Sequence, residues 1–139
     1  MENILSIAPM VDKTDRHFRN FVRMITDKPM LYTEMITAKA ILNGNVDYIL
    51  GFNDIEHPIT LQIAATTSED AYEAVLKAEK FNYDEININV GCPSDKVSGN
   101  MMGAYLMAFP EVVAEMVTQM KRATNKPITV KHRIGIDGK

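Results

Sequence analysis

Five short apolar segments recur along the chain, and stretches with helical periodicity separate them. The segments cover residues 4–8, 30–33, 59–64, 85–90 and 128–131. Short apolar runs bounded by turn residues are typical of buried strands. The pattern therefore predicts five strands.

The intervals between these strands predict helices. The first has apolar residues at i, i+3, i+4 and i+7, namely Phe18, Phe21, Val22 and Ile25, with Thr14 or Asp15 as the cap. Weaker periodicity covers 38–42, and a third helix is expected over 68–80, where Thr67 and Asp70 have capping-box spacing. A fourth begins at Pro110. Regular alternation of strands and helices predicts an α/β fold with parallel strands and right-handed crossovers.

Two α/β architectures have this alternation, the doubly wound sheet and the (β/α)₈ barrel. The first strand leads into Pro9-Met10-Val11-Asp12, which lacks the glycine pattern of a dinucleotide-binding turn. The residues suited to chemistry follow the expected strands: Pro9, Glu34, Gln62, Asn89 with Cys92, and Lys131. In a barrel all these strand ends open on one face, where active sites are built.

The barrel is therefore the predicted architecture. A complete barrel needs about 250 residues, so residues 1–139 are expected to form one partial domain, the N-terminal portion (about half) of a (β/α)₈ TIM barrel. The stretch 51–58 is expected to be only a polar connection within it.

Composition narrows the class of protein. With 46% hydrophobic and 24% charged residues, the chain has the make-up of a soluble globular domain. A single cysteine excludes an internal disulfide and a Cys-x-x-Cys pair, and no metal site is expected. No signal peptide is expected, and no run of about 20 apolar residues occurs. A cytoplasmic location without membrane contact is therefore expected. The net charge of −3 does not indicate nucleic-acid binding.

Cys92 ends an apolar run within Gly91-Cys92-Pro93. Glycine permits unusual backbone angles and proline fixes its own φ, so the thiol lies on a stiff turn at the mouth of the sheet. The residues alone leave a reactive and an inert thiol equally open.

Several sequence blocks occur together in one order. They are Ala8-Pro9-Met10, Asp15-Arg16, Tyr32-Thr33-Glu34-Met35, Leu61-Gln62, residues 84–94 with Asn89-Val90-Gly91-Cys92-Pro93, and residues 130–135. This arrangement resembles the tRNA-dihydrouridine synthases, and residues 14–17 with the Cys-Pro-Ser-Asp-Lys-Val run resemble their A-type bacterial branch. The resemblance implies a flavin-binding barrel followed by a small helical domain, the latter expected to lie outside this chain. It also implies reduction of D-loop uridines of the 20/20a type in tRNA, with FMN recharged by NADPH.

The resemblance also implies roles for particular residues. Cys92 corresponds to the acid that protonates C5 of the uracil, and Asn89 to a residue that contacts the substrate uridine. Five residues correspond to flavin contacts: Pro9, Met10, Val11, Gln62 and Lys131. A hydride must come from reduced flavin because no side chain can supply it. The acid then faces the flavin across the base.

For several other residues the sequence predicts a place in the structure or a possible contact, but no specific role in the reaction. Glu34 either holds the substrate side of the pocket or pairs with Arg16, and Gly99 and Gly103 are candidate hinges of the Cys92 loop. His132 is expected to face the helix layer. Basic side chains could contact tRNA: Lys13, Arg16, Arg19, Arg23, Lys121, Arg122 and Lys126.

Two alternatives remain. The first is another FMN barrel that acts on a free pyrimidine, such as a dihydroorotate dehydrogenase. The second is an inactive half-barrel that self-associates through its open sheet edges. The isolated 139 residues are expected to bind FMN poorly, because barrel enzymes commonly hold the cofactor phosphate after strands seven and eight.

Overall fold

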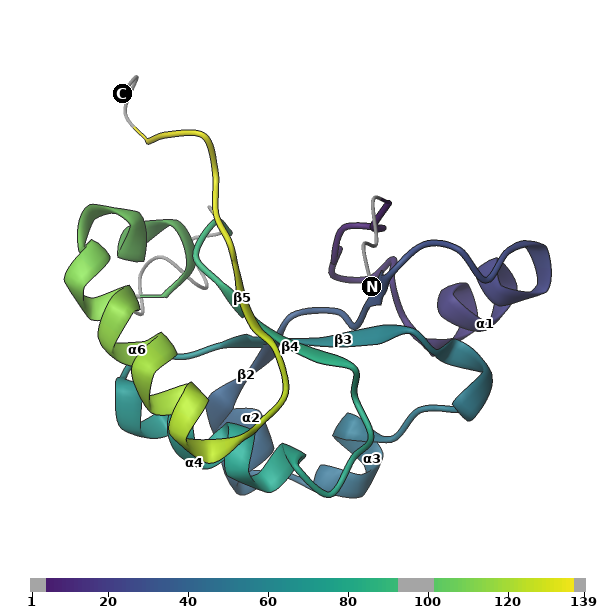
Figure 1. Cartoon of the computed structure of the whole chain (residues 1–139), viewed down its shortest axis with the longest axis horizontal. Coiled ribbons are helices and arrows are strands. Elements are labelled where there is room, and N and C mark those ends of the chain that lie inside the picture. Colours follow the sequence, from purple (N-terminus) through teal and green to yellow (C-terminus); the bar gives the residue numbers. More distant parts are fainter. Residues whose placement is uncertain (1–4, 93–101, 137–139) are drawn as a thin grey trace.

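The computed structural model describes residues 5–92 and 102–136, and Figure 1 presents their arrangement. The helices are α1 (Arg16–Ile25), α2 (Ala38–Asn43), α3 (Val46–Leu50), α4 (Ser68–Ala78) and α6 (Pro110–Ala123), with 3₁₀ helices η1 (Asp54–Glu56) and η2 (Gly103–Ala108). The strands are β1 (Leu31–Tyr32), β2 (Ile36–Thr37), β3 (Ile59–Ala64), β4 (Glu85–Asn89) and β5 (Ile128–Lys131). The α/β alternation predicted from the sequence is confirmed.

All strands of the sheet are parallel, and their order in space follows their order in the chain. The neighbours run β1, β3, β4, β5, and β2 also pairs with β3. A doubly wound sheet would reverse direction at a switch point, whereas a barrel adds each strand beside the last. The sheet is therefore a partial (β/α)₈ barrel. The strand expected over 4–8 is wrong in extent, because its described residues form a single parallel bridge from Ser6 to Met30.

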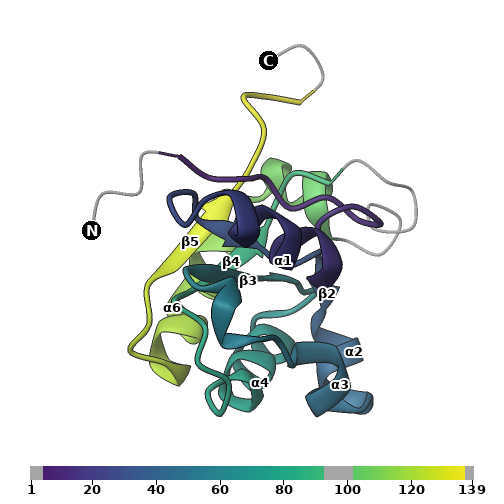
Figure 2. The same ribbon diagram turned by 90° about the vertical axis from the view of Figure 1, so that its right-hand side faces the viewer.

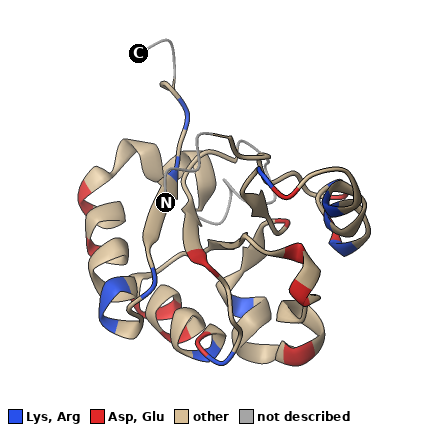
Figure 3. Ribbon diagram, turned by 45° about the vertical axis from the view of Figure 1, so that its right-hand side comes forward, with Lys and Arg blue, Asp and Glu red and all other residues tan. Residues whose placement is uncertain are grey.

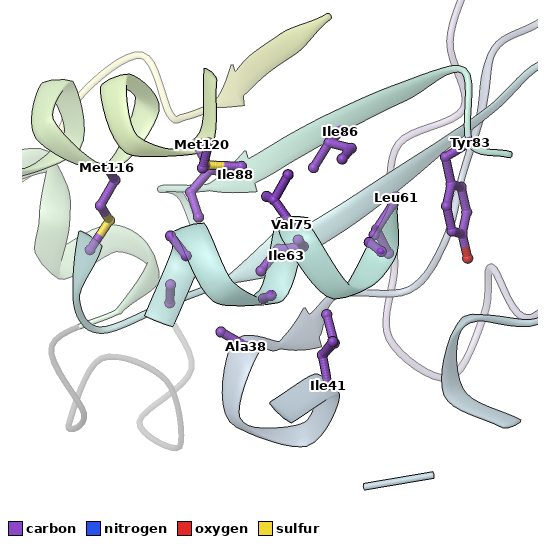
Figure 4. Packing of buried hydrophobic residues seen from close by; sticks show 14 of the residues in the cluster. Ala38, Ile41, Leu61, Ile63, Val75, Tyr83, Ile86, Ile88, Met116 and Met120 are labelled. Atoms are coloured by element: carbon purple, nitrogen blue, oxygen red, sulfur yellow. The ribbon is translucent and has the colours of Figure 1, made fainter. Parts of the chain in front are cut away.

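The hydrophobic core lies between the outer face of the sheet and the helices. Figures 1 and 2 place α2, α4 and α6 on the same side of the strands. The outward residues of β3 and β4 are fully buried there: Ile59, Leu61, Ile63, Ile86 and Ile88. They pack against Val75 of α4 and against Met116 and Met120 of α6 (Figure 4). The helix that begins at Pro110 thus supplies Met116 and Met120 to the core.

An irregularity divides the second predicted strand into β1 and β2. Tyr32 pairs with Thr60 and Ile36 pairs with Ile63. Between these two pairs the chain advances four positions from Tyr32 but only three positions along β3. This extra residue is a β-bulge. At the break the Thr33 hydroxyl accepts the Gln62 N–H at 3.0 Å, replacing a backbone acceptor. The bulge allows Ile36 to join the outer core.

Helix α1 is attached by a buried ion pair that the sequence pattern did not predict. Arg19 Nε lies 2.5 Å from Glu56 Oε2, and both side chains are almost completely buried. Glu56 belongs to the 51–58 stretch, so describing that stretch as only a polar connection was wrong. The expected apolar face is also wrong in part, because Phe21 is 60% and Ile25 69% exposed. Asp15, one of the two predicted caps, accepts the N–H of Phe18.

Candidate functional site

Polar side chains line the inner face of the sheet at alternate positions, opposite the helices. Thr60 and Gln62 lie on β3, Glu85, Asn87 and Asn89 on β4, and Thr129 and Lys131 on β5. Alternation arises because successive side chains of a strand point to opposite faces. Gln62 and Asn89, both predicted site residues, are buried together here. Gln62 lies two residues before the end of β3 rather than at its end.

The amides of these residues are hydrogen-bonded to one another. Asn89 Nδ2 donates to Gln62 Oε1 at 3.0 Å, and Gln62 Nε2 donates to Asn87 Oδ1 at 2.8 Å. Asn87 Nδ2 in turn donates to Thr129 Oγ1 at 2.8 Å. Buried amides are costly without partners, so these contacts hold Gln62 and Asn89 in fixed orientations.

Cys92 follows β4 on a turn that Asn89 closes. Asn89 Oδ1 accepts the backbone N–H of Gly91 at 3.1 Å and that of Cys92 at 2.9 Å. The Cys92 side chain is partly buried and packs against the cluster of Ala64 and Met102, against which Met35 also packs. The structure therefore places the thiol at the carboxyl end of the sheet, close to Asn89.

Gly91 lies in a tightly packed position and does not have an unusual backbone angle. Its φ is not in the left-handed region, and a Cβ at this position would lie 3.3 Å from the His132 carbonyl carbon. Arg133 Nε donates to the Gly91 carbonyl at 2.6 Å. The turn is thus held against the segment after β5. Of the two expected hinges, Gly103 has a φ of 61° at the start of η2, and Gly99 lies outside the described residues.

The loop that contains Pro9, Met10 and Val11 is held by two polar side chains. The Thr14 hydroxyl accepts the Met10 N–H at 3.0 Å, and the Met10 carbonyl accepts the Thr14 N–H at 2.9 Å. Glu34 Oε1 accepts the N–H of Asp12, a residue with a positive φ of 62°, at 2.7 Å. Met10 and Val11 are exposed. These contacts give the loop a definite shape.

A hollow of about 240 Å³ lies between this loop and β5. It is lined by Ser6, Ala8, Pro9, Tyr32, Asn87, Thr129, Val130 and Lys131. The structure therefore brings Pro9 and Lys131 to one cavity, with Gln62 adjacent through Asn87. Apolar groups along one wall and an ammonium at the rim suit a planar aromatic ring with a polar edge. These residues fit the ring of a flavin.

Glu34 and Arg16 line a second cavity, of about 530 Å³, near the start of α1. The predicted pair between them does not form, because the Glu34 carboxylate accepts the Asp12 N–H and Arg16 donates to the carbonyls of Tyr48 and Gly51. Glu34 therefore acts on the Pro9–Val11 loop.

Helix α1 is rich in arginine and carries no acidic residue, whereas both signs occur on α4 and α6 (Figure 3). Two of these arginines, Arg19 and Arg23, are held at least partly buried by their partners. Arg19 pairs with the buried Glu56, and Arg23 donates to the carbonyls of Glu56, Pro29 and Pro58. They are therefore not free to contact RNA, whereas Arg16 is exposed although it donates to the carbonyls of Tyr48 and Gly51.

The histidines have ordinary environments. His132 is exposed with Nδ1 2.7 Å from the Arg133 carbonyl, so its expected place in the helix layer is wrong. His57 Nδ1 lies 2.7 Å from the Asp84 carboxylate. Within residues 5–92 and 102–136, no group of three or more metal-ligating side chains is present, and no helix is long and apolar enough to span a membrane.

Sequence reasoning missed Asn87, Thr129 and Glu85 as members of the inner face. Glu85 Oε1 accepts hydroxyl hydrogens from Tyr32, Thr60 and Thr129 at 3.2, 3.3 and 2.7 Å. Burial, and then the Glu85 charge, raise the pKa of the Tyr32 hydroxyl, so it donates as a neutral phenol. The available signal was the strict alternation in residues 85–89, where polar positions separate two isoleucines.

Comparison with known proteins identifies the class. Residues 6–139 match the model of the family described as "Dihydrouridine synthase (Dus)". The match covers nearly the whole chain, in which the strand order is that of a barrel and the inner face carries the Asn89–Cys92 turn. The chain belongs to the dihydrouridine synthase family, a class of flavin-dependent oxidoreductases.

Curated relatives agree with this assignment. The chain is 51% identical over 135 residues to a tRNA-dihydrouridine(20/20a) synthase of Synechocystis sp., covering 97% of this chain and 40% of the relative. It is 50% identical over 133 residues to the tRNA-dihydrouridine(20/20a) synthase of Vibrio parahaemolyticus, with 96% and 40% covered. The chain thus spans about two-fifths of the length of these relatives.

Proposed function

We propose that this chain is the part of a tRNA-dihydrouridine synthase that carries the proton donor and one side of the flavin site. Residues 1–139 would form a partial catalytic domain. The reaction is reduction of the C5–C6 bond of D-loop uridines in tRNA, of the 20/20a type. Support comes from relatives near 50% identity that bear this name. It also comes from the clustering of the expected site residues at one end of the sheet.

One observation carries the proposal: Asn89 fixes the turn that presents Cys92. Both N–H groups that follow β4 are bound by the same carboxamide oxygen, at 3.1 and 2.9 Å. A general acid must be held within reach of the carbon that it protonates. In the proposed reaction Cys92 Sγ gives its proton to C5 of the uracil. Asn89 keeps one amide N–H outside these contacts, and that group would contact the base.

The inner face would hold the cofactor. FMN, when bound, supplies the hydride for C6 after reduction by NADPH. Lys131, at the rim of the hollow, would place its ammonium against the polar edge of the ring and favour negative charge there. Pro9, Met10 and Val11 would cover the ring through their backbone, in a loop already fixed by Thr14 and Glu34. Gln62 would offer its remaining amide N–H.

The substrate must be presented as a single flipped base. A stacked uracil cannot reach a thiol at the end of a strand, so the uridine has to be extruded from the RNA. Bases in loops are the usual targets of such recognition. The partner is therefore a folded tRNA, in the cytoplasm. The net charge of −3 implies that any phosphate contacts are local or come from outside this chain.

The test is dihydrouridine formation by the full-length protein. Unmodified tRNA is incubated with FMN and NADPH, and dihydrouridine at positions 20 and 20a is measured by mass spectrometry of nuclease fragments. The expected result is product on tRNA, none on free uracil, and none from Cys92→Ala. Turnover of dihydroorotate without turnover of tRNA would overturn the proposal in favour of a free-pyrimidine enzyme.

A further inference from the structure

The inner face holds one continuous line of hydrogen bonds that runs from Glu85 to the Cys92 turn. Glu85 Oε1 accepts from the hydroxyl of Thr129, and Thr129 Oγ1 accepts from Asn87 Nδ2. The line continues through Gln62 and Asn89 as described above and ends at the N–H groups of Gly91 and Cys92. It therefore crosses three strands, β5, β4 and β3.

The Glu85 carboxylate gives this line a direction. An ionised carboxylate only accepts, so the Thr129 hydroxyl must point its hydrogen at Glu85 and can accept from Asn87. Asn87 then turns its NH₂ group to Thr129 and its oxygen to Gln62. Because Asn87 presents its oxygen, Gln62 must turn its NH₂ group to Asn87, and its own oxygen then accepts from Asn89.

The other end of the line demands the same direction. Backbone N–H groups only donate, so Gly91 and Cys92 require the oxygen of Asn89 and not its NH₂ group. A carboxamide has similar shape in both orientations, and its hydrogen-bond partners decide between them. Here the two ends agree, and each amide has one orientation that satisfies all its partners.

We propose that Glu85, Thr129 and Asn87 are positioning residues, which hold the Asn89 carboxamide in the orientation that fixes the Cys92 turn. Asn87 is the central member, because both its oxygen and its NH₂ group are engaged within the line. Only the catalytic consequence rests on the proposed function. The effect on the turn itself requires neither flavin nor tRNA.

Thr129 offers a matched pair of substitutions. Thr129→Val keeps the shape of the side chain but removes the hydroxyl. Asn87 Nδ2 then loses its acceptor, and Glu85 no longer determines the orientation of the amides. Thr129→Ser keeps the hydroxyl and loses a methyl group. If the hydroxyl positions the turn, the valine variant changes Cys92 and the serine variant does not.

The readouts are made on the 139-residue chain, where Cys92 is the only cysteine. The rate of alkylation by iodoacetamide reports on the thiol, and hydrogen exchange of the Cys92 amide reports on its bond to Asn89. Thr129→Val is expected to raise both rates about fivefold, as for loss of one typical hydrogen bond. Thr129→Ser should stay within about twofold of the parent on both readouts.

A control for stability and a second variant complete the test. Ile88 lies on β4 next to Asn87 but faces the outer core, so Ile88→Val should lower stability without changing either Cys92 readout. If Thr129→Val does not fold, Asn87→Leu, which interrupts the line at its centre, replaces it with the same expectation. Parental rates in a folded Thr129→Val or Asn87→Leu variant would overturn the proposal, as would equal changes in Ile88→Val. Failure of dihydrouridine synthesis alone would leave these readouts, and so the positioning role, unaffected.

Discussion

The two faces of β3 and β4 are buried to a similar extent but are built from different chemistry. On the outer face Leu61, Ile63 and Ile88 are fully buried against helices, and their contribution is the removal of apolar area from water. On the inner face Gln62 and Asn87 are almost as buried, yet each amide is paired. Among the described residues no buried side-chain nitrogen or oxygen lacks a partner. The outer face therefore supplies stability, whereas the inner face supplies side chains of fixed orientation.

The largest effect is expected from truncating the outer face. Ile88→Ala should lower the free energy of unfolding by about 2–5 kcal/mol, because it leaves a cavity in a close-packed core. Urea unfolding followed by circular dichroism measures this. Ile55→Ala is the matched control, since Ile55 is exposed and should cost far less. Equal losses for the two variants would break the distinction between core and surface.

A substitution at the inner face should lower the rate of dihydrouridine formation strongly and change the free energy of unfolding little. Cys92→Ala in the full-length protein should retain FMN but lower dihydrouridine formation by about 10²-fold, as for a lost general acid. The rate is measured under single-turnover conditions with excess enzyme. Met35→Leu, which keeps the apolar contact beside Cys92, serves as the control and should remain near the parental rate. Parental activity in Cys92→Ala would exclude the thiol as the acid.

A smaller effect is expected from Lys131 at the rim of the hollow. Lys131→Ala in the full-length protein should weaken FMN binding about fivefold, the upper range for an exposed charge interaction. Flavin fluorescence during dialysis measures retention. Lys131→Arg keeps the positive charge and should lose less, and Lys121→Ala on the exposed surface of α6 should lose nothing. The role of Lys131 would be refuted by unchanged retention together with unchanged flavin reduction by NADPH.

The smallest effect concerns pH and the outer core. Burial raises the pKa of the Tyr83 hydroxyl above its ordinary value of 10.0, and the hydroxyl donates to the Leu50 carbonyl at 2.7 Å. The folded chain then keeps a proton that the unfolded chain loses, so this contribution is complete below pH 10 and declines as the pH rises above 10.

Tyr83→Phe tests this dependence. It should cost about 1 kcal/mol at neutral pH, for the lost hydrogen bond, and flatten the fall in stability above pH 10. Urea unfolding at pH 7 to 11 measures both effects. Tyr48→Phe at an exposed position is the control, and an unchanged slope in Tyr83→Phe would contradict the assignment.

Much of the fold could be predicted from local pattern. The bounds of β3 and β5 were predicted without error, as was the start of α6 at Pro110, because strand runs and a proline at the first helical position are local signals. The Arg19–Glu56 pair was missed because its members are 37 residues apart and neither is unusual in its own segment. Helix α3 was missed because it has only five residues, too few for a periodic pattern. The bulge after β1 was missed because it depends on how β1 and β2 pair with β3.

Some residues of the candidate site were predicted from the sequence, and others were missed. The resemblance led to Cys92, Asn89, Gln62 and Lys131, and the structure places them at one end of the sheet, but their roles stay predictions. Asn87 and Glu85 were missed because the segment 85–90 was predicted only as an apolar strand, although every second position from Glu85 to Asn89 is polar. Self-association of the chain also stays a prediction.

The extra residue between β1 and β2 decides which face of the sheet the side chains around it point to. With it, Leu31 and Ile36 both face the helices although they lie five positions apart. Deleting one residue between Tyr32 and Ile36 would remove the bulge and restore strict alternation, in which residues four positions apart share a face. Ile36 would therefore keep its place beside Ile63, whereas Glu34, within the shortened stretch, would lose its place beneath the Asp12 N–H. A single-codon deletion here would thus alter the Pro9–Val11 loop and leave the outer core in place.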